Sequence, residues 1–415
     1  MVHIRNGTSL PESYDSETHD LKSSGQRIRW FPHILPAPSD LEGRSIAHKL
    51  VALGHWNDDV ESHLFSFLDL QITSRGDEVI TSNMDMLGTY EHSGAVTDIG
   101  IADLETSGEM LVAIASSTGT ICLARLLLPR LPGTSPADIQ ILDFPSEEQR
   151  LTPWVHPHNG PVVSVDIHAD SRLVLSAGAD GSLCVLDPAA ADPQSTPAFK
   201  PCNSPGYISF CNARWCDSQQ IVSVTSSSTI SLWDMRQAPL PVLQSPKSWG
   251  LTGPSSGYSD VQAHWLDVHP SRPNVCAVGC SGGVVSVWDL RMQAQPLACS
   301  MCGQGDVWEV KFDVSEASTS AVHSQSSVVP SVLAATEGGL LSQLSDCKPG
   351  MASSGAYHTT KPAVSTLGLQ HSGTLVCGYG SVNSFDVQSG DHGMRDVVCV
   401  TDSQELIYIR GGPEK

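Results

Sequence analysis

The chain of 415 residues holds 44 acidic and 23 basic side chains, which gives a formal net charge of −21. This balance argues against direct binding of nucleic acid, because such binding needs a basic face that displaces counterions from phosphates. No stretch reaches the ~18 consecutive apolar residues of a membrane span, and the first twenty residues lack the apolar core of a secretory signal, so we expect no membrane insertion and 12 reduced cysteines.

From residue 26 onward, short apolar runs alternate with turns rich in Gly, Pro, Ser and Asn. Val-rich runs between such turns predict short antiparallel strands. The first group of runs falls within residues 26–88 and the second within 89–145, where Thr118-Gly119 marks a turn. Residues 1–25 are polar, and we expect them to be partly ordered, with Val2–Ile4 as a candidate terminal strand.

The third group, within residues 155–200, repeats the same order of runs as VVSVDIH, LVLSAG and LCVLD. Asp180-Gly181 stands at its second turn. Its last part, AADPQSTPAFKP, contains three prolines. Because proline cannot donate to a strand ladder, we expect a weak outer strand there.

The fourth and fifth groups, within residues 207–245 and 258–300, are the clearest copies of the unit. Each closes on the sequence Trp-Asp-x-Arg, first as Trp233-Asp234-Met235-Arg236 and then as Trp288-Asp289-Leu290-Arg291. The sixth and seventh groups fall within residues 303–350 and 363–412. The polar stretches 313–331 and 345–362 interrupt this part, and we expect them to be surface loops, either tolerated insertions or sites of partner contact and phosphorylation.

The unit of three or four strands that ends on Trp-Asp resembles the WD40 repeat, which is one four-stranded blade of a propeller. Seven units predict an all-β, seven-bladed WD40 propeller with loop insertions over residues 26–412. In WD40 blades, His, Ser or Thr, Trp and Asp side chains form a hydrogen-bonded network. The resemblance assigns that structural role to His158, Ser176, Asp180, Trp233, Asp234, Trp288 and Asp289. The network is incomplete, since Leu186 replaces the Trp of the third unit and Ser228 and Ser281 occupy the Asp position of the next two.

The sequence offers little support for catalysis. Gly279-Cys280-Ser281-Gly282-Gly283 matches G-x-S-x-G, but a nucleophile elbow needs a helix after the turn, and the following residues, VVSVW, predict a strand. Cys299 and Cys302 form a single C-x-x-C without the second pair that a zinc site requires. Phosphate-binding loops and H-E-x-x-H are absent from the sequence. We therefore expect no enzymatic activity, no cofactor, no metal and no small-molecule substrate.

Several stretches go beyond the general repeat. LGHWNDD at 53–59, VAIASSTG at 112–119, VWEVKF at 307–312 and SVNSFDV at 381–387 resemble the forty-three-kilodalton WD-repeat nucleoporin family. This resemblance implies a non-enzymatic subunit of the Y-shaped scaffold complex of the nuclear pore, located at the nuclear envelope. It also implies binding to α-helical scaffold nucleoporins and support of pore assembly and of protein and mRNA transport.

A second hypothesis rests on the two Trp-Asp-x-Arg endings. They resemble the motif by which some WD40 proteins dock on the adaptor of the cullin-4 ubiquitin ligase, with Arg236 and Arg291 as the docking side chains. Both copies lack the Asp expected before the Gly of the upstream turn. The alternative structural interpretation is that each arginine pairs with a nearby carboxylate.

Overall fold

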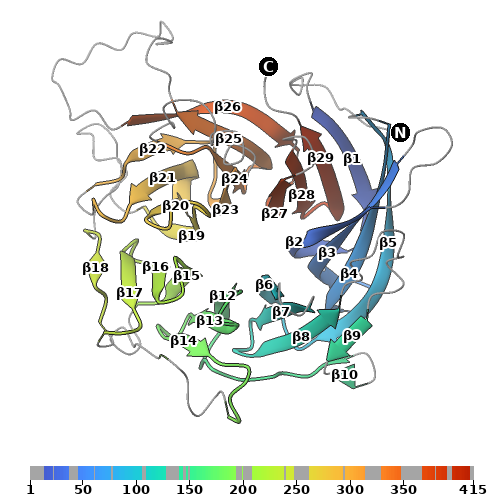
Figure 1. Ribbon diagram of the computed structural model, residues 1–415. Coiled ribbons are helices and arrows are strands. Elements are labelled where there is room, and N and C mark those ends of the chain that lie inside the picture. Colours follow the sequence, from blue (N-terminus) through green and yellow to red (C-terminus); the bar gives the residue numbers. More distant parts are fainter. Residues whose placement is uncertain are drawn as a thin grey trace, which may run out of the picture.

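The computed structural model describes most of the chain. The described residues are 14–21, 23–36, 45–59, 61–75, 78–104, 109–127, 140–143, 146–147, 150–192, 199, 208–237, 240–246, 261–292, 295–313, 329–346, 367–378, 380–389 and 395–411. They form seven antiparallel blades around one axis (Figure 1), so the predicted fold class is confirmed. Within these residues we find no helix with the length and apolar character needed to cross a membrane.

The first three blades differ in size. Blade 1 consists of β2 (Ser24–Pro36), β3 (Ser45–Asn57), β4 (Ser62–Arg75) and β5 (Glu78–His92), extended by β11 (Arg150–Leu151) and β10 (Ser146–Glu147). Blade 2 consists of β6 (Val96–Leu104), β7 (Glu109–Ser116), β8 (Ile121–Leu127) and β9 (Gln140–Asp143). Blade 3 has β12 (Val162–His168), β13 (Leu173–Gly178) and β14 (Leu183–Leu186). In the fourth position of blade 3, the described chain has only a bridge between Val185 and Phe199, within the proline-containing stretch.

Blades 4 to 6 follow in chain order. Blade 4 consists of β15 (Phe210–Trp215), β16 (Gln220–Thr225), β17 (Ile230–Asp234) and β18 (Leu243–Gln244). Blade 5 consists of β19 (Ala263–Val268), β20 (Val275–Cys280), β21 (Val284–Asp289) and β22 (Ala298–Met301), with a 3₁₀ turn, η2, at Ser281–Gly283. Blade 6 consists of β23 (Val307–Phe312), β24 (Val332–Thr336), β25 (Leu340–Asp346) and β26 (Leu367–Cys377).

Blade 7 closes the ring with strands from both parts of the chain. It joins β27 (Val382–Ser389), β28 (Arg395–Thr401) and β29 (Glu405–Gly411) to the N-terminal β1 (Tyr14–Asp20), which lies beside β29 in Figure 1. A terminal strand thus completes the last blade, and it is drawn from residues 14–20 within the polar segment 1–25. The candidate Val2–Ile4 lies outside the described residues.

One predicted blade boundary needs correction. The last blade was predicted to begin at residue 363, but β26 pairs along most of its length with β25 and is therefore the outer strand of blade 6. It also makes two parallel pairings with β22, which join blades 5 and 6 into one sheet. Parts of the stretches 313–331 and 345–362 lie outside the described residues.

Apolar side chains fill the spaces between neighbouring blades. Among the described residues, seven hydrophobic clusters each combine residues of two adjacent blades. One cluster, for example, packs Trp30 and Leu53 of blade 1 against Val398 and Tyr408 of blade 7. Because a single blade cannot bury both faces, this packing against both neighbours provides the core.

Candidate interaction site along the propeller axis

Two polar clusters fix individual blades, and one was expected from the sequence. The imidazole of His158, which is buried, lies 2.8 Å from Ser176 Oγ through Nε2, and 3.2 Å from Asp180 Oδ1 through Nδ1. Ser182, which the sequence analysis did not identify, lies 2.8 Å from Nδ1. Burial works to raise the pKa of Asp180, but hydrogen bonds from His158 and Ser182 outweigh it and lower that pKa.

The second cluster was not anticipated. In blade 1, buried His55 lies 2.8 Å from Ser23 Oγ and 2.8 Å from Ser66 Oγ, and Ser66 in turn contacts Thr89. Burial lowers the pKa of His55 to about 4, so the neutral imidazole is the stable form at pH 7. Each cluster links the segment before the first strand of its blade to the following strands of that blade.

The residues of the two Trp-Asp-x-Arg endings separate into a buried and an exposed part. The indoles of Trp233 and Trp288 are buried and donate to Ser223 Oγ at 2.8 Å and Ser286 Oγ at 3.0 Å. In each ending, the Asp and the Arg form an ion pair with each other. The Nε–Oδ1 and Nη2–Oδ2 distances are 2.9 and 2.6 Å in both Asp234–Arg236 and Asp289–Arg291. The arginine side chains remain 65% and 70% exposed.

The serines at the expected Asp positions bind backbone instead. Ser228 Oγ accepts a hydrogen bond from the backbone of Ala263, and Ser281 Oγ accepts one from Gln262. The turn that contains Ser281 leads directly into strand β21, so the helix that a nucleophile elbow needs is not there. Cys299 and Cys302 are free thiols, and the described residues include no group of three or more His, Cys, Asp or Glu that could hold a metal.

A charged lining along the axis was not predicted from the sequence. In each blade, the pairing of the inner strand with the second strand shifts register near the start of the inner strand. The residue that follows the shift and the residue two positions later occupy equivalent places in all seven blades. We call the two sets the first and second ring. The first ring is Arg27, Asp98, Ser164, Asn212, Trp265, Glu309 and Ser384. The second ring is Arg29, Gly100, Asp166, Arg214, Asp267, Lys311 and Asp386.

Carboxylates of both rings connect five of the seven blades, namely blades 2, 3, 5, 6 and 7, each to the next blade. They accept hydrogen bonds from backbone N–H groups of the following inner strand: Asp98 from Val165 at 3.1 Å, Asp166 from Trp215 at 2.9 Å, Asp267 from Phe312 at 2.9 Å, Glu309 from Phe385 at 3.2 Å and Asp386 from Trp30 at 2.8 Å. An inner strand has no strand partner on its axial side, so these carboxylates satisfy donors that would otherwise lack one.

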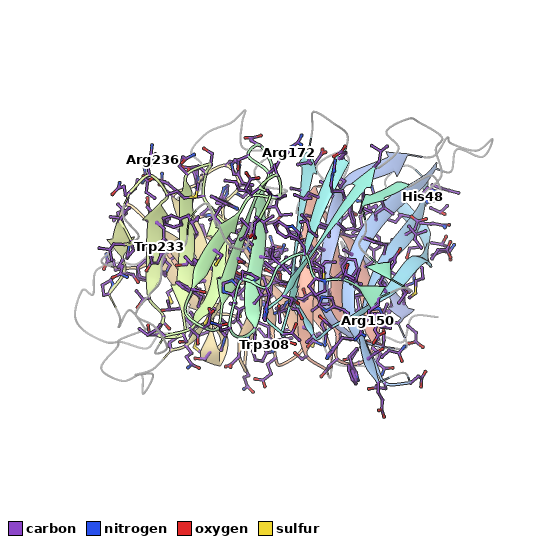
Figure 2. The ribbon with its side chains drawn as sticks, turned by 90° about the horizontal axis from the view of Figure 1, so that it is seen from below. His48, Arg150, Arg172, Trp233, Arg236 and Trp308 are labelled. Carbon is purple, nitrogen blue, oxygen red and sulfur yellow. The ribbon has the colours of Figure 1, made fainter. Side chains whose placement is uncertain are left out.

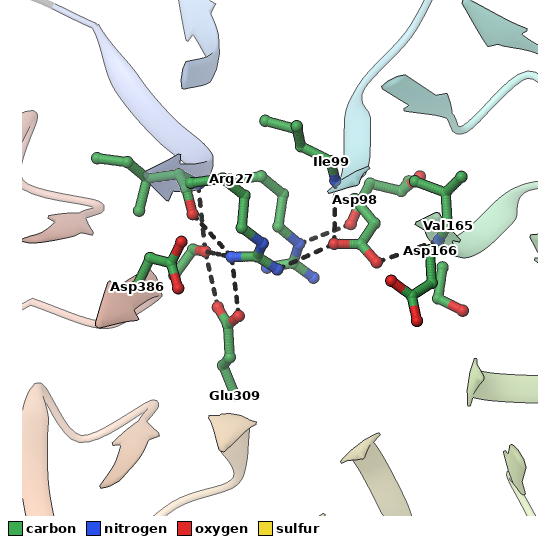
Figure 3. Close-up of polar contacts among 12 residues, drawn as sticks. Arg27, Asp98, Ile99, Val165, Asp166, Glu309 and Asp386 are labelled. Atoms are coloured by element: carbon green, nitrogen blue, oxygen red, sulfur yellow. Dashed lines mark hydrogen bonds and ion pairs between the residues drawn. The ribbon is translucent and has the colours of Figure 1, made fainter. Parts of the chain in front are cut away.

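Arginines neutralise two of these buried carboxylates. Arg29 Nη2 lies 2.9 Å from Asp98 Oδ1 and its Nη1 lies 2.9 Å from Glu309 Oε1, and Figure 3 shows dashed lines from both carboxylates toward the guanidinium groups between them. Arg214 Nη1 lies 3.0 Å from Asp98 Oδ2. Burial alone would lower the pKa of Arg29, but Glu309 and Asp98 outweigh it and raise that pKa. Burial would raise the pKa of Asp98, and Arg214 and Arg29 reverse the effect and lower it.

A cavity of about 600 Å³ opens at one end of this lining. Every blade contributes to its wall, from Arg27 of blade 1 to Asn383 of blade 7, and three tryptophans take part: Trp56, Trp265 and Trp308. Figure 2 places Trp308 at one edge of the ring and Arg236 and Arg172 at the opposite edge. The cavity and the two Trp-Asp-x-Arg endings are therefore on different faces of the propeller.

No protein-family model matches the chain. Among curated proteins, it is similar to the nuclear pore complex protein NUP43 of Arabidopsis thaliana, with 23% identity over 327 residues that cover 76% of this chain and 81% of the relative. It is also similar to nucleoporin Nup43 of Mus musculus and of Homo sapiens, each 24% identical over 69% of this chain and 67% of the relative. The resemblance expected from the sequence is therefore confirmed.

Among solved structures, the chain resembles the WD40 β-propeller domain of Doa1, with a TM-score of 0.55. The superposition covers 97% of this chain and 98% of the other at 12% sequence identity. At that level of identity the likeness concerns the fold alone.

Proposed function

We propose that this chain is a Nup43-like nucleoporin, a non-enzymatic scaffold subunit of the nuclear pore complex. The observation that carries the proposal is the similarity to Nup43 proteins of a plant and two mammals over 69–76% of the chain. The pieces that first indicated this family lie in blades 1, 2, 6 and 7, so the resemblance is spread around the ring and not confined to one repeat.

The physical character of the ring supports a scaffold role. Its inner strands are connected by buried carboxylates, and hydrophobic clusters fill the spaces between blades. Such a ring offers fixed outer surfaces to partners without needing to change shape. The one formal catalytic match, at Ser281, binds backbone within a turn.

The proposed partners are α-helical scaffold subunits of the Y-shaped complex, and the proposed location is the nuclear envelope. Exposed apolar side chains suited to packing against helices occur around the outer parts of blades 4 and 5: Leu240, Val242, Met292 and Met301. Leu240 is the most open of them, with 70% of its surface exposed. Apolar side chains of this kind are typical of protein-binding surfaces.

Fluorescence microscopy and affinity purification test this function. In cells of its own species, the tagged chain should give a continuous nuclear rim and should co-purify with the other subunits of the Y-shaped complex. The fluorescent tag alone serves as the control and should be diffuse. Diffuse fluorescence of the tagged chain together with no enrichment of nucleoporins would overturn the proposal.

The cullin-4 hypothesis is not favoured, since the relatives are nucleoporins. The geometry also accounts for both arginines structurally, because each guanidinium is engaged by the Asp two residues before it. Replacing Arg236 and Arg291 together by Ala should leave co-purification with nucleoporins unchanged. A loss of cullin-4 adaptor from the purified material on this double substitution would instead favour the ligase hypothesis.

A further inference from the structure

The cavity at the end of the axis contains Arg27, which forms no ion pair at contact distance with a described carboxylate, while the charges of Glu309 and Asp98 act on it from further away. Arg27 donates only to backbone carbonyls: Nε to Thr97 O at 2.6 Å, and Nη1 to Gln26 O at 3.3 Å and Asn383 O at 3.0 Å. No hydrogen bond to another described residue engages its Nη2. Arg29 and Arg214, in contrast, each have a carboxylate oxygen within 3.0 Å.

The Trp265 ring and three backbone carbonyls hold the Arg27 guanidinium in place. Its central carbon lies 4.9 Å from the centre of the Trp265 ring, a cation–π distance, and three carbonyls fix the other nitrogens. A guanidinium fixed in this way, with one nitrogen open, is suited to binding a carboxylate through charge-assisted hydrogen bonds.

Free anions from bulk solvent would gain little from this site. The two rings together hold four cationic side chains (Arg27, Arg29, Arg214 and Lys311) and five carboxylates (Asp98, Asp166, Asp267, Glu309 and Asp386), so the axis has no excess of positive charge. Recognition must then come from short-range contacts with Arg27 and the cavity wall. A carboxylate that is attached to a larger ligand gains those contacts, and a small ion does not.

The wall of the cavity offers aromatic surface for such a ligand. Trp56 packs against His63 at 4.6 Å between ring centres, and Trp308 packs against His264 at 5.4 Å. The Trp308 indole N–H has no hydrogen-bond partner among the described residues and is available to a ligand. Tryptophans provide large contact areas at low entropic cost, as in many peptide-binding sites.

Acidic side chains stand at the margin of this wall. Asp58 accepts from the Trp56 indole at 2.8 Å, Asp306 lies 3.1 Å from His264 Nε2, and Glu337 accepts from the Asp306 backbone at 3.3 Å. These carboxylates disfavour acidic residues beside the inserted one and favour basic or uncharged residues there.

We propose that this cavity binds an extended segment of a partner protein in which a single acidic side chain enters toward Arg27 and basic or uncharged residues flank it. The Arg27 Nη2 donates to the inserted carboxylate, and Trp56 and Trp308 contact the flanking residues. This inference does not depend on the assignment to the nuclear pore, and either can fail without the other.

Fluorescence anisotropy with two labelled peptides tests the proposal. The probes are Lys-Gly-Glu-Gly-Lys and the same peptide with Gln in place of Glu, both carrying a neutral label. The Glu peptide should bind the full chain about ten-fold or more tightly than the Gln peptide, as expected for a charge-assisted hydrogen bond. Equal affinity for the two peptides, or no binding of either, would overturn the proposal.

Three variants locate the site. Arg27→Gln should abolish the preference for Glu, and Arg236→Gln on the opposite face should leave it unchanged. Trp308→Ala should weaken both peptides and keep the preference, which provides a test should Arg27→Gln fail to fold. An Arg27→Gln variant that folds and still prefers the Glu peptide would contradict the assignment, as would unaltered binding of both peptides by Trp308→Ala.

Sodium acetate as a competitor separates a peptide site from a site for small anions. Acetate at millimolar concentration should not displace the Glu peptide, because it reaches Arg27 without the contacts of the wall. Displacement by acetate at the concentration at which the peptide itself binds would show a site for free anions and would reject the peptide proposal.

Discussion

Arg29 is the arginine of the axis that pairs with two different buried carboxylates. Its guanidinium reaches Asp98 of blade 2 and Glu309 of blade 6, and also donates to the Phe385 carbonyl of blade 7. One side chain of blade 1 thus contacts three other blades. Removing it leaves Glu309 without the cation that lies closest to it and leaves Asp98 with Arg214 alone.

Replacing Arg29 by Met should therefore lower the free energy of unfolding by about 3–5 kcal/mol, the usual cost of leaving a buried charge without its partner. Urea unfolding followed by circular dichroism measures this change. Arg236→Ala, which removes an exposed arginine from its pair with Asp234, is the matched control and should leave the midpoint unchanged. Equal midpoints for the Arg29→Met variant and the natural chain would mean that the axial charges add nothing to stability.

His55 makes stability depend on pH. Its pKa of about 4 in the folded chain lies below the ordinary 6.5, so the unfolded chain binds the proton more readily between these values. Stability from this residue is complete above pH 6.5 and is lost as the pH falls toward 4. The full effect is about 3 kcal/mol.

Unfolding free energies of the natural chain and of His55→Gln, measured between pH 7 and pH 5, test this dependence. The variant should be less stable at pH 7, because it loses the contacts with Ser23 and Ser66, and its stability should fall less steeply with acidification. Identical slopes for the two proteins would show that His55 does not contribute to the pH dependence of stability.

At this scale, the sequence predicts what is local. His158, Ser176 and Asp180 were identified together because they lie within one repeat, at spacings typical of WD40 blades. Arg29 and Asp98 are 69 residues apart, and Arg29 and Glu309 are 280 apart, so no spacing within a repeat relates them. A usable signal did exist in pairs of polar residues two apart on otherwise apolar inner strands, such as Arg27 with Arg29 and Glu309 with Lys311.

Strand β1 shows how an element can escape detection. Its sequence, YDSETHD, has no apolar alternation, because it is the outermost strand of blade 7 and is held mainly by its ladder with β29. Side chains add a connection to blade 1, where Glu17 accepts from Ser82 and His19 lies 2.8 Å from the same hydroxyl. The Val-rich inner and middle strands were predicted because both of their faces are buried, which makes their composition distinctive.

Deleting residues 1–21 should destabilise the ring, because it removes all seven residue pairs between β1 and β29. At roughly 1 kcal/mol for each hydrogen bond, the loss amounts to several kcal/mol, which corresponds to a decrease of roughly 5–15 °C in the unfolding midpoint. Deleting residues 1–12 leaves β1 intact and is the control. A thermal unfolding midpoint that is the same for both deletions would show that β1 does not hold the ring closed.

At the scale of the whole molecule, closure joins residues from opposite ends of the chain. Backbone and side-chain contacts between blades 1 and 7 include Trp30 N to Asp386 and Ile28 N to Ser384, each 356 residues apart. In an open solenoid, each repeat contacts only its neighbours, and a terminal repeat can separate at the cost of a single interface. In this ring, the loss of any blade exposes apolar surface on two others and breaks the axial network of carboxylates.

This architecture predicts that the blades unfold together. Tryptophan fluorescence reports mainly blades 1, 4, 5 and 6, where Trp30, Trp233, Trp288 and Trp308 lie. The residues of blade 7 include no tryptophan, and fluorescence senses that blade only through the packing of Trp30 against Tyr408. Far-ultraviolet circular dichroism reports the strands of every blade. The two urea transitions should coincide, since blade 7 cannot open without removing the partners of blade 1.

Deleting residues 1–21 should separate the two transitions, because blade 7 then loses one strand and its link to Ser82. Separate midpoints in the full chain would show instead that the contacts between blades 1 and 7 are too weak to make the ring a single cooperative unit.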